Sequence, residues 1–425
     1  MEYIKINGKK RLQGTVKIAG AKNAALPIMM ASILASETII LKNVPILSDI
    51  DNVIILLEDL GYFIDKKEED IDAGTQIVKI IPVEKIHYEI SSKVSSSMRA
   101  SIWALGPMVA KHKKAIIPLP GGCKLGKRSI DMHIDALEKM GVTICIENDK
   151  IIAECKTRLD AISYDFVKIS VGATANILMA ACLANGISKL SNCAIEPEII
   201  DLANFLNSIG AKISGIGTPN LEIEGVTILG GCEYTIISDR LEAGTYAIAC
   251  AITHGEIIIE NIDPNIMSNV LDCLNSIGVD INIKVNSIHV KSGGQFLSTN
   301  ISTQPYPGFP TDMQAQISSL LSLAKGDSEI EENIFENRFM HIHELNKMGA
   351  KIDMINNQKW VIRGGRDMIG ANLVASDLRG AASLVLAALG ATGVSTIHNL
   401  EYLDRGYANL DNKLLKLGAD ITRIS

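Results

Sequence analysis

The 425-residue chain has no apolar run long enough to cross a membrane. Its most apolar stretches, residues 24–36 and 381–394, are rich in Ala, Gly and Ser, and neither reaches the roughly 20 strongly apolar residues that a spanning helix needs. The first residues, MEYIKINGKKRLQG, lack the apolar segment of a signal peptide. We therefore expect a protein of the cytoplasm that does not act with a membrane.

Paired cysteines and an excess of positive charge are also absent. No C-x-x-C motif occurs among the eight cysteines, which excludes zinc ribbons and thioredoxin-like sites. The formal net charge is −7, whereas nucleic acid and anionic membranes bind broad positive faces, so we expect neither as a partner. A small anion is still compatible with this charge, because a pocket needs only a few local cations. The length favours two domains.

One 17-residue pattern recurs six times: an amphipathic helix, then Gly, then the start of a strand. The copies span residues 48–64, 128–144, 197–213, 265–281, 336–352 and 405–421. The fourteenth position is always glycine: Gly61, Gly141, Gly210, Gly278, Gly349 and Gly418. Glycine suits the left-handed conformation that ends a helix, and the β-branched residues after it favour a strand.

A second pattern lies between these copies and consists of a helix of small residues followed by an Ile-rich strand. Examples are GAKNAALPIMMASILASETIIL, SVGATANILMAACLANGISKL, DRLEAGTYAIACAITHGEIII and SDLRGAASLVLAALGATGVSTI. Small side chains on nearly every face indicate helices that are buried and closely packed. Six such units predict an α/β protein with two domains of three units. A binding solenoid is the alternative, but solenoid repeats are shorter, about 20–50 residues.

The units differ in the charged residues at equivalent helix starts. A helix start binds anions readily, because its free N–H groups point outward and carry partial positive charge. An isolated surface arginine is usually solvated, but a fold that turns its helix starts to one cleft would gather several. The charged residues at these positions are Lys22, Arg99, Arg128, Arg240, Asp312, Arg338, Arg379 and Arg405.

The loop LPGGCKLGKRSIDMH, residues 119–133, nearly matches a phosphate-binding loop, since Gly121 to Lys127 fits G-x-x-x-x-G-K. Arg128 stands where Ser or Thr should bind magnesium, which disfavours a nucleotide hydrolase. The alternative is a glycine loop that presents Cys123, whose thiolate the neighbouring cations favour. We interpret Cys123 as the reactive cysteine and the other seven as packing residues. His341 and His343, two apart on one helix, point to different faces, so we expect no metal site.

The motifs of these loops, taken in order, resemble one known family. They are GAKNAALP, RASIWALGP, LPGGCKLGKR, SVGATANI, EPEIID, FPTDMQAQ, FENRFMH, ASDLR and DRGY. The chain is similar to the UDP-N-acetylglucosamine 1-carboxyvinyltransferases, the enolpyruvyl transferases of peptidoglycan synthesis, from about residue 5 to its end. The resemblance implies a two-domain inside-out α/β barrel of six βαβαββ-type units, three per domain. It places one domain at residues 1–21 with 238–425 and the other at residues 22–237.

The resemblance also implies a reaction. The enolpyruvyl group of phosphoenolpyruvate moves to the 3′-hydroxyl of UDP-N-acetylglucosamine by addition and elimination, and phosphate is released. Cys123 matches the family's general acid, which is also the target of fosfomycin, and Asp312 matches its general base. Lys22 and Arg405 complete the implied catalytic set. No cofactor is implied, and a monomer and a homo-oligomer are both compatible with the sequence.

Further residues match substrate-binding positions of the family. The family's ligands of the phosphoenolpyruvate phosphate are matched by Lys22, Arg128 and Arg405, with Asn23 beside them. Further cleft positions are matched by Arg338, Asp377 and Arg379, with Arg379 expected near the substrate carboxylate. Those on the nucleotide-sugar side are Arg99, Arg128, Ser129, Ile130, Asp131, Met132, Lys168, Ile169, Ser170, Val171, Gly172, Asp312 and Ile334. Because these residues come from both halves of the chain, we expect the nucleotide sugar to close the two domains and order the Cys123 loop.

Two other activities are compatible with the same architecture. The nearer one is a transferase like 5-enolpyruvylshikimate-3-phosphate synthase, which uses the same donor but lacks such a cysteine loop. The more distant one is a catalytically silent homologue that binds nucleotide sugars and regulates wall synthesis. Ser48 and Tyr402 depart from some relatives of this family, which carry Lys and His near these segments.

Overall fold

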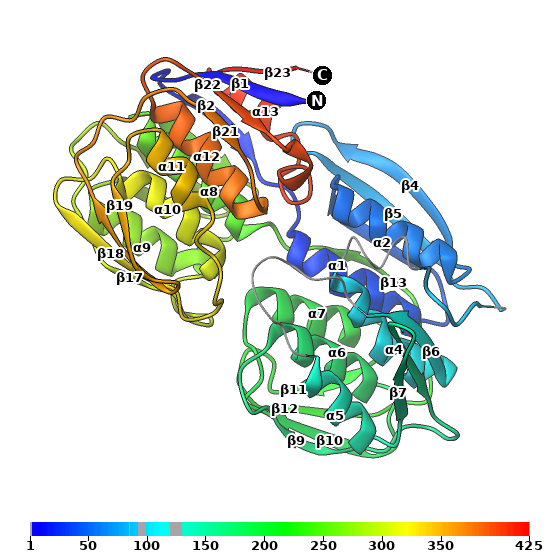
Figure 1. Ribbon diagram of the computed structural model, residues 1–425. Helices are drawn as coiled ribbons and strands as arrows, with labels where there is room; N and C mark the ends of the chain where they lie inside the picture. Colours follow the sequence, from blue (N-terminus) through cyan, green and yellow to red (C-terminus); the bar gives the residue numbers. More distant parts are fainter. Residues whose placement is uncertain (1, 85, 92–98, 120–129, 425) are drawn as a thin grey trace.

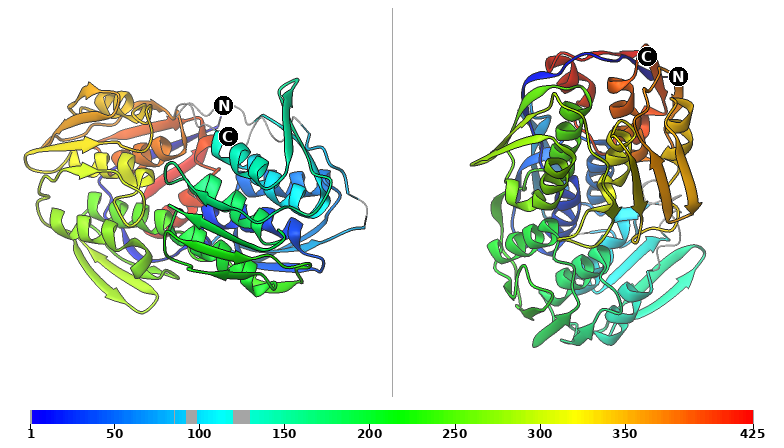
Figure 2. Two further views of the ribbon diagram at one scale, coloured as in Figure 1. Left: turned by 90° about the horizontal axis from the view of Figure 1, so that it is seen from below. Right: turned by 90° about the vertical axis from the view of Figure 1, so that its left-hand side faces the viewer.

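A computed structural model describes residues 2–84, 86–91, 99–119 and 130–424, without the side chain of Arg99. The chain folds into two lobes that have helices inside and small sheets outside (Figure 1). Two turned views show the same layering in each lobe (Figure 2). The buried apolar residues form two clusters: one draws on residues 19–236 with Ala408, and the other on residues 4–18 and 241–421.

The described strands form six sheets, three in each lobe. In the lobe of residues 19–236 the orders are β13 (Cys232–Thr235), β3 (Ile39–Pro45), β5 (Thr75–Ile81), β4 (Phe63–Asp70); β6 (Lys114–Pro118), β8 (Lys150–Glu154), β7 (Thr143–Glu147); and β11 (Lys212–Ser214), β12 (Leu221–Glu224), β10 (Ile187–Ser191), β9 (Ser163–Asp165). In the other lobe they are β15 (Asp280–Lys284), β16 (Ser287–Lys291), β14 (Glu256–Glu260), β2 (Gln13–Lys17); β17 (Ile301–Ser302), β18 (Asp327–Glu331), β20 (Lys359–Arg363), β19 (Ile352–Asn356); and β21 (Asn372–Val374), β22 (Val394–His398), β1 (Tyr3–Asn7), β23 (Asp420–Ile424).

One pairing scheme recurs in five of the six sheets of the described residues, and the sixth keeps most of it. A parallel pair at one edge is followed by two antiparallel pairs, as in β13–β3, β3–β5 and β5–β4. The three-stranded sheet of β6, β8 and β7 keeps both antiparallel pairs, and a single parallel bridge between Glu89 and Ile116 takes the place of the missing strand. The six-fold repeat that the sequence predicts is therefore a repeat of hydrogen-bonding topology as well.

Six helices of small residues form the inner layer within the described residues: α1 (Lys22–Ala31), α4 (Leu105–His112), α6 (Val171–Ala181), α8 (Arg240–Ile252), α10 (Gln314–Leu321) and α12 (Leu378–Gly390). α8 is buried along its whole length and α12 at every residue but Leu378, as their composition predicts. A Cβ on Gly106 would lie 2.4 Å from the main-chain oxygen of Asn176, so α4 and α6 approach as closely as only glycine permits.

Six amphipathic helices lie beside this layer: α2 (Ser48–Asp59), α5 (Asp131–Lys139), α7 (Pro197–Ser208), α9 (Ser268–Ile277), α11 (His341–Lys347) and α13 (Leu410–Lys416). Short 3-10 helices are η1 (Ser32–Leu34), η2 (Arg99–Ala104), η3 (Pro264–Met267), η4 (Thr311–Met313) and η5 (Leu400–Tyr402). The glycine that follows each amphipathic helix has a positive φ between 91° and 105°. The prediction that this glycine ends the helix in the left-handed conformation is therefore confirmed.

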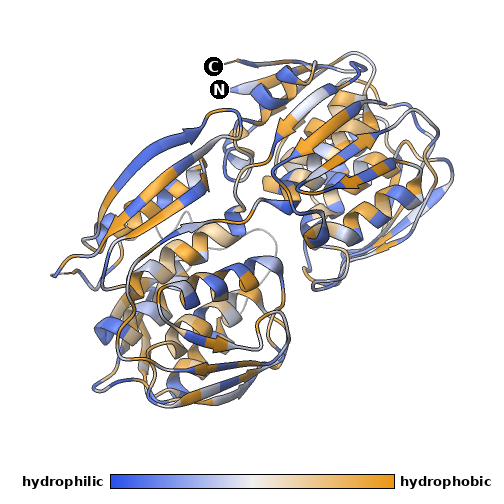
Figure 3. Cartoon of the chain, turned by 180° about the vertical axis from the view of Figure 1, so that it is seen from behind, coloured by the Kyte–Doolittle hydropathy of each residue, from blue (hydrophilic) through white to orange (hydrophobic). Residues whose placement is uncertain are grey.

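Alternating burial keeps the outer faces of the sheets polar. The hydrophilic outer strand in Figure 3 is β4, and the hydrophobic strand beside it is β5, which faces the helices.

Cys145 lies on the edge strand β7 with its side chain exposed, so the prediction that it is a packing residue is wrong. Its outward position in an edge strand explains the difference, because only alternate residues of a strand face the core. Cys182, Cys193 and Cys250 are buried as predicted.

Candidate active site

The two segments that carry the chain between the lobes lie side by side. Gly20 and Ser238 form an antiparallel bridge, and the main-chain N–H of Ala21 donates to the carbonyl of Ile237 at 2.7 Å. Each segment runs directly into a helix, α1 in one lobe and α8 in the other. The starts of two helices from different lobes therefore lie close together at the junction.

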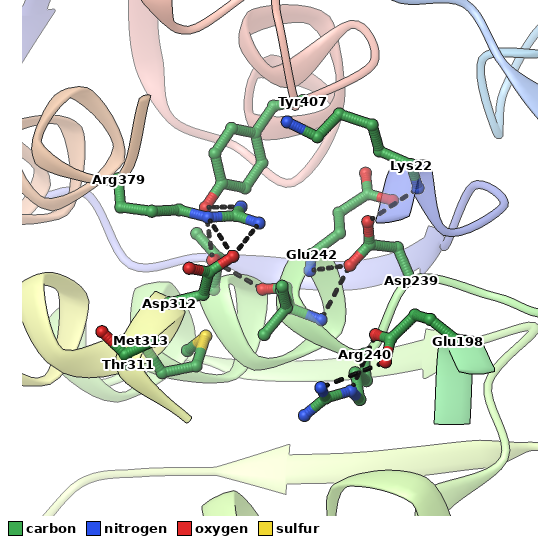
Figure 4. A network of polar contacts seen from close by, with 12 residues as sticks. Lys22, Glu198, Asp239, Arg240, Glu242, Thr311, Asp312, Met313, Arg379 and Tyr407 are labelled. Carbon is green, nitrogen blue, oxygen red and sulfur yellow. Dashed lines mark hydrogen bonds and ion pairs between the residues drawn. The ribbon is translucent and has the colours of Figure 1, made fainter. Parts of the chain in front are cut away.

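Asp239 ties these two helix starts to each other. Its Oδ1 accepts from the N–H groups of Leu241 at 2.8 Å and Glu242 at 3.0 Å, as an N-cap residue does. Its Oδ2 accepts from the main-chain N–H of Lys22 at 3.3 Å (Figure 4). An aspartate before α8 thus fixes the position of the first residue of α1.

Asp49 bridges two cations that come from opposite lobes. Its Oδ2 lies 3.2 Å from Nζ of Lys22, and its Oδ1 accepts from Nε of Arg405 at 2.9 Å. The side chains of Lys22 and Asp49 are 10% and 4% exposed, whereas that of Arg405 is 38% exposed. The bridge therefore presents positive charge to solvent mainly through Arg405, which leaves an anion room to approach.

Asp312 forms a second charged group with two arginines of its own lobe. Its Oδ1 lies 2.7 Å from Nη1 of Arg338, and its Oδ2 lies 3.0 Å from Nη2 of Arg379. Arg379 is buried, and its Nη1 also donates to the hydroxyl of Tyr407 at 3.0 Å. Figure 4 shows Asp312 and Tyr407 holding the same guanidinium from two sides. The Asp312 side chain keeps 25% of its surface exposed, so a ligand can reach it.

The pKa values of Lys22 and Asp312 are both lowered, but by different causes. Burial lowers the pKa of Lys22, and Asp49 opposes that shift, with Arg379 and Arg405 adding to it. Burial alone would raise the pKa of Asp312, but the guanidiniums of Arg338 and Arg379 outweigh it and hold that pKa well below its usual range. Asp312 is therefore ionised near neutral pH and is a weak proton acceptor while both arginines bind it.

Arg240 lies at a helix start as predicted, but it does not join these groups. Its Nε and Nη2 donate to Glu198 on α7 at 2.9 and 3.2 Å, and both side chains are buried. This bidentate pair joins the two lobes, because α7 and α8 belong to different ones. Glu198 lies in the EPEIID motif, and its pairing with Arg240 was not predicted.

Eight of the predicted nucleotide-sugar positions, residues 130–132 and 168–172, lie at the starts of α5 and α6 in the lobe of residues 19–236. Lys168 and Ile169 are exposed, and Ser170 caps α6 by accepting from the N–H of Ala173 at 3.3 Å. The remaining positions there are Val171 and Gly172, which are partly buried, Ile130, which precedes α5, Asp131, which is exposed, and Met132, which is buried. These residues do not contact the Asp312 group in this structure, so any shared role requires a ligand between them.

Three further predicted positions have local roles in the fold. Asp377 caps α12 by accepting from the N–H groups of Arg379 at 3.0 Å and Gly380 at 2.9 Å. Ile334 is 37% exposed, and its N–H donates to Glu332 at 2.9 Å. Asn23 is the second residue of α1 and is half-buried. Cys123, Arg128 and Ser129 lie outside the described residues, as does the side chain of Arg99, so their roles stay predictions.

Sequence reasoning missed Asp49 and Tyr407. Asp49 lies in the first turn of α2, where an acidic residue ordinarily interacts with the helix dipole and solvent. The signal was its place beside the apolar residues Leu47 and Ile50, which face the core. Tyr407 stands in the DRGY motif two residues after Arg405, and a buried tyrosine usually places its hydroxyl against a hydrogen-bond partner.

Other kinds of site find no support in the described part of the chain. No three His, Cys, Asp or Glu side chains there are placed to hold a metal ion. His341 is buried and His343 is exposed, so the two do not share a face. Among the described helices, none combines the length and apolarity that a membrane crossing requires.

Comparison with known proteins places the chain in a family. The family model described as EPSP synthase (3-phosphoshikimate 1-carboxyvinyltransferase) matches residues 6–414. The chain is 46% identical to a UDP-N-acetylglucosamine 1-carboxyvinyltransferase of Pseudoalteromonas atlantica, and the match covers all of both chains. It is 45% identical to the protein of the same name from Glaesserella parasuis, over all of this chain and 99% of that one.

Solved structures share the fold at lower identity. The enolpyruvyl transferase NikO from Streptomyces tendae superposes with a TM-score of 0.89 at 22% identity, covering 99% of this chain and 98% of that one. EPSP synthase from Acinetobacter baumannii superposes with a TM-score of 0.77 at 18% identity over the whole of both chains. These likenesses confirm the predicted fold class. With relatives at this identity along its full length, the chain belongs to the UDP-N-acetylglucosamine 1-carboxyvinyltransferases, within the enolpyruvyl transferases.

Proposed function

We propose that the protein transfers the enolpyruvyl group of phosphoenolpyruvate to the 3′-hydroxyl of UDP-N-acetylglucosamine in the cytoplasm and releases phosphate. The observation that carries this proposal is the pairing of two charged groups at one junction. Lys22 and Arg405, joined by Asp49, suit a phosphate, and Arg338 and Arg379 around Asp312 suit a carboxylate beside a base. Phosphoenolpyruvate carries both a phosphate and a carboxylate.

Each side chain then has a defined task. The sugar hydroxyl gives its proton to Asp312 while its oxygen bonds to C2 of the donor, and C3 takes a proton from Cys123. The Cys123 thiolate then takes a proton back from C3 as the C2–O bond to phosphate breaks, which restores the double bond, and the proton held by Asp312 leaves with the phosphate. Lys22 and Arg405 stabilise the charge on the departing phosphate. These roles rest on the family resemblance and on the geometry of the described residues.

The direct test is phosphate release from phosphoenolpyruvate with each of two acceptors. We expect release with UDP-N-acetylglucosamine and none with 3-phosphoshikimate. The reverse preference would identify the shikimate enzyme, whose family model also matches this chain. Binding of UDP-N-acetylglucosamine without any phosphate release would identify a silent homologue.

Replacing Cys123 by serine is expected to abolish sensitivity to fosfomycin and to lower activity steeply. A thiolate is the reactive form of cysteine, and a hydroxyl neither forms a comparable nucleophile nor gives up its proton as readily. Fosfomycin inhibition curves of the wild type and the variant measure the effect. Cys145→Ser is the matched control, because Cys145 is exposed on β7 and should leave both properties unchanged. A Cys123→Ser enzyme that fosfomycin still inhibits would remove Cys123 from the mechanism.

Replacing Asp49 by asparagine is expected to lower the pH at which phosphoenolpyruvate binding is lost as the pH rises. Burial already lowers the pKa of Lys22, and Asp49 is the main group that opposes this, with a smaller contribution from Asp312. Without the carboxylate, Lys22 loses its proton earlier as the pH rises, and a neutral amine holds phosphate poorly. The alkaline limb of kcat/KM for phosphoenolpyruvate should therefore shift to lower pH. Asp51→Asn, which removes an exposed pair with Lys66 on the same helix, should leave the limb in place.

We also propose that residues 1–21 with 238–425 and residues 22–237 act as two domains that the nucleotide sugar closes. The exposed positions at the start of α6 and the Asp312 group lie on different lobes, and both must contact one substrate. Small-angle scattering should show a smaller radius of gyration after UDP-N-acetylglucosamine is added. An unchanged radius at saturating ligand would rule out this closure.

A further inference from the structure

Asp312 has two incompatible tasks in this structure. As the proposed base it must accept a proton, yet both of its carboxylate oxygens are bound by guanidiniums, at 2.7 Å to Arg338 and 3.0 Å to Arg379. A carboxylate in two close ion pairs accepts a proton reluctantly, because protonation would leave two buried cations without their partner. At least one guanidinium must therefore leave Asp312 before the base can act.

Arg379 has a second anchor that does not involve Asp312. Its Nη1 donates to the Tyr407 hydroxyl at 3.0 Å, and its guanidinium lies over the Tyr407 ring, 5.4 Å from the ring centre. Arg338 also has a second contact, from Nη1 to the Thr311 hydroxyl at 2.9 Å. Both arginines therefore keep a contact in the site when Asp312 turns away.

The hydrogen bonds of the Tyr407 hydroxyl have fixed directions. Arg379 and Gln316 both donate to it, at 3.0 and 3.1 Å, because neither nitrogen can accept. Its own proton goes to Thr245 Oγ1 at 3.1 Å, since that hydroxyl donates to the carbonyl of Leu241. The tyrosine is buried, so solvent does not compete for these contacts. One hydroxyl thus links α8, α10 and α12 beneath the site.

We propose that Tyr407 is a positioning residue that retains Arg379 in the site while the donor carboxylate displaces Asp312 from that guanidinium. Donor binding then frees Asp312 to take the hydroxyl proton of the acceptor as the new C–O bond forms. The inference rests on the proposed function, because it assigns Asp312 as the base. This exchange of partners at Arg379 makes Asp312 available as a base only when the donor is bound. The acceptor hydroxyl is therefore not deprotonated before there is a donor carbon to attack.

Several charged groups surround Asp312, and they show which of its contacts depends on the Tyr407 hydroxyl. Arg338 and Arg379 bind Asp312, and Lys22 acts on it from across the junction. Asp239, at the start of α8, acts on Arg379. Among these groups the described hydrogen bonds link only Arg379 to Tyr407. Removing the Tyr407 hydroxyl therefore affects Asp312 through Arg379. The Arg379 guanidinium would then remain paired with the Asp312 carboxylate.

The test compares Tyr407→Phe with Tyr246→Phe. Tyr246 is a fully buried tyrosine on α8 whose hydroxyl has no hydrogen-bond partner among the described residues, so it controls for loss of a buried hydroxyl. We expect Tyr407→Phe to lower kcat roughly tenfold, the effect of losing one hydrogen bond to a charged group. The KM for UDP-N-acetylglucosamine should change by less than about twofold, within the effect of one weak contact. Tyr246→Phe should match the wild type in both constants.

The pH profile of kcat separates positioning from a structural role. A base is active above its pKa, so the acid limb of the profile follows the pKa of Asp312 in the complex. If Arg379 stays on Asp312 in Tyr407→Phe, that pKa is lower, and the limb moves to lower pH while the plateau falls. Thr245→Val removes the acceptor of the Tyr407 proton and should shift the acid limb and the plateau in the same directions by smaller amounts. If Tyr407→Phe does not fold, Thr245→Val provides the test of positioning.

The possible results are distinct. If Tyr407→Phe has an unchanged kcat, or a lower plateau with an unmoved acid limb, the inference is overturned. Activity of the wild type and of Tyr246→Phe would still support the proposed function. A wild type that releases no phosphate with UDP-N-acetylglucosamine would overturn the proposed function, and this inference with it.

Discussion

Replacing Asp312 by asparagine is expected to lower kcat by a factor on the order of 10²–10⁴, the usual contribution of a positioned base. The amide is close in shape but cannot take the hydroxyl proton. It also leaves Arg338 and Arg379 without their shared carboxylate, so both guanidiniums are free for the donor carboxylate. The KM for phosphoenolpyruvate should therefore stay level or fall while kcat collapses. Steady-state kinetics on the folded variant, checked by its melting temperature, measure both constants.

The matched control for this variant is Asp327→Asn. Asp327 also pairs with an arginine, Arg363, but this pair is exposed on the outer sheet of the same lobe. Exposed pairs contribute about 0–1 kcal/mol, so the control should keep full activity and nearly full stability. If Asp312→Asn kept a tenth or more of the wild-type kcat, the base would have to be another group.

Replacing Lys413 by methionine is expected to lower the free energy of unfolding by about 3–5 kcal/mol. Lys413 Nζ lies 2.7 Å from Glu242 Oε1, and each side chain is 3% exposed. Glu242 also accepts from the main-chain N–H of Ala19 at 2.9 Å, in the segment that joins the lobes. Without the lysine, a buried carboxylate lacks its counter-charge next to that segment. Denaturant unfolding of the wild type and the variant measures the loss.

The pH dependence of this loss has a definite sign. Burial raises the pKa of Glu242, with Lys413 opposing the shift, so removal of Lys413 raises it further. A carboxyl with a raised pKa in the folded state favours folding at low pH and opposes it as the pH rises. The deficit should therefore be smaller at about pH 5 than at about pH 8. A second change, Glu242→Gln, should restore much of the stability, because it removes the unpaired charge.

Lys416→Met controls for the loss of a lysine from the same helix. Lys416 pairs with Asp72 at an exposed position, so the change should stay within about 0.5 kcal/mol. Equal losses for the two lysine variants would mean that the buried pair contributes no more than an exposed one.

Much of the fold follows from local signals in the sequence. The glycine at the fourteenth position predicts the end of each amphipathic helix, because only glycine adopts that positive φ without strain. The small-residue helices predict the inner layer, since larger side chains would hold the helices apart. The exchange of strands between halves does not follow from such signals. β2 pairs with β14 and β13 pairs with β3, and both choices depend on contacts between distant residues.

The candidate site was only partly predictable for a related reason. Lys22, Asp312, Arg338, Arg379 and Arg405 stand at or near helix starts, where charge has an evident use. Which charge would pair with which depends on the junction, so Asp49 as the bridge between Lys22 and Arg405 was not foreseen. Arg240 shows the converse, because the same position in another unit binds Glu198 and joins the lobes.

The strand exchange also has a consequence for the order of folding during synthesis. Residues 19–238 include every strand of their three sheets, so that lobe can complete its pairing once about half the chain has been made. β1 and β2 precede that lobe in the chain, yet their partners lie beyond it, at residues 256–260, 394–398 and 420–424. β1 must therefore stay unpaired until residues 394–398 and 420–424 have been made, well after the lobe of residues 19–238 can complete its sheets.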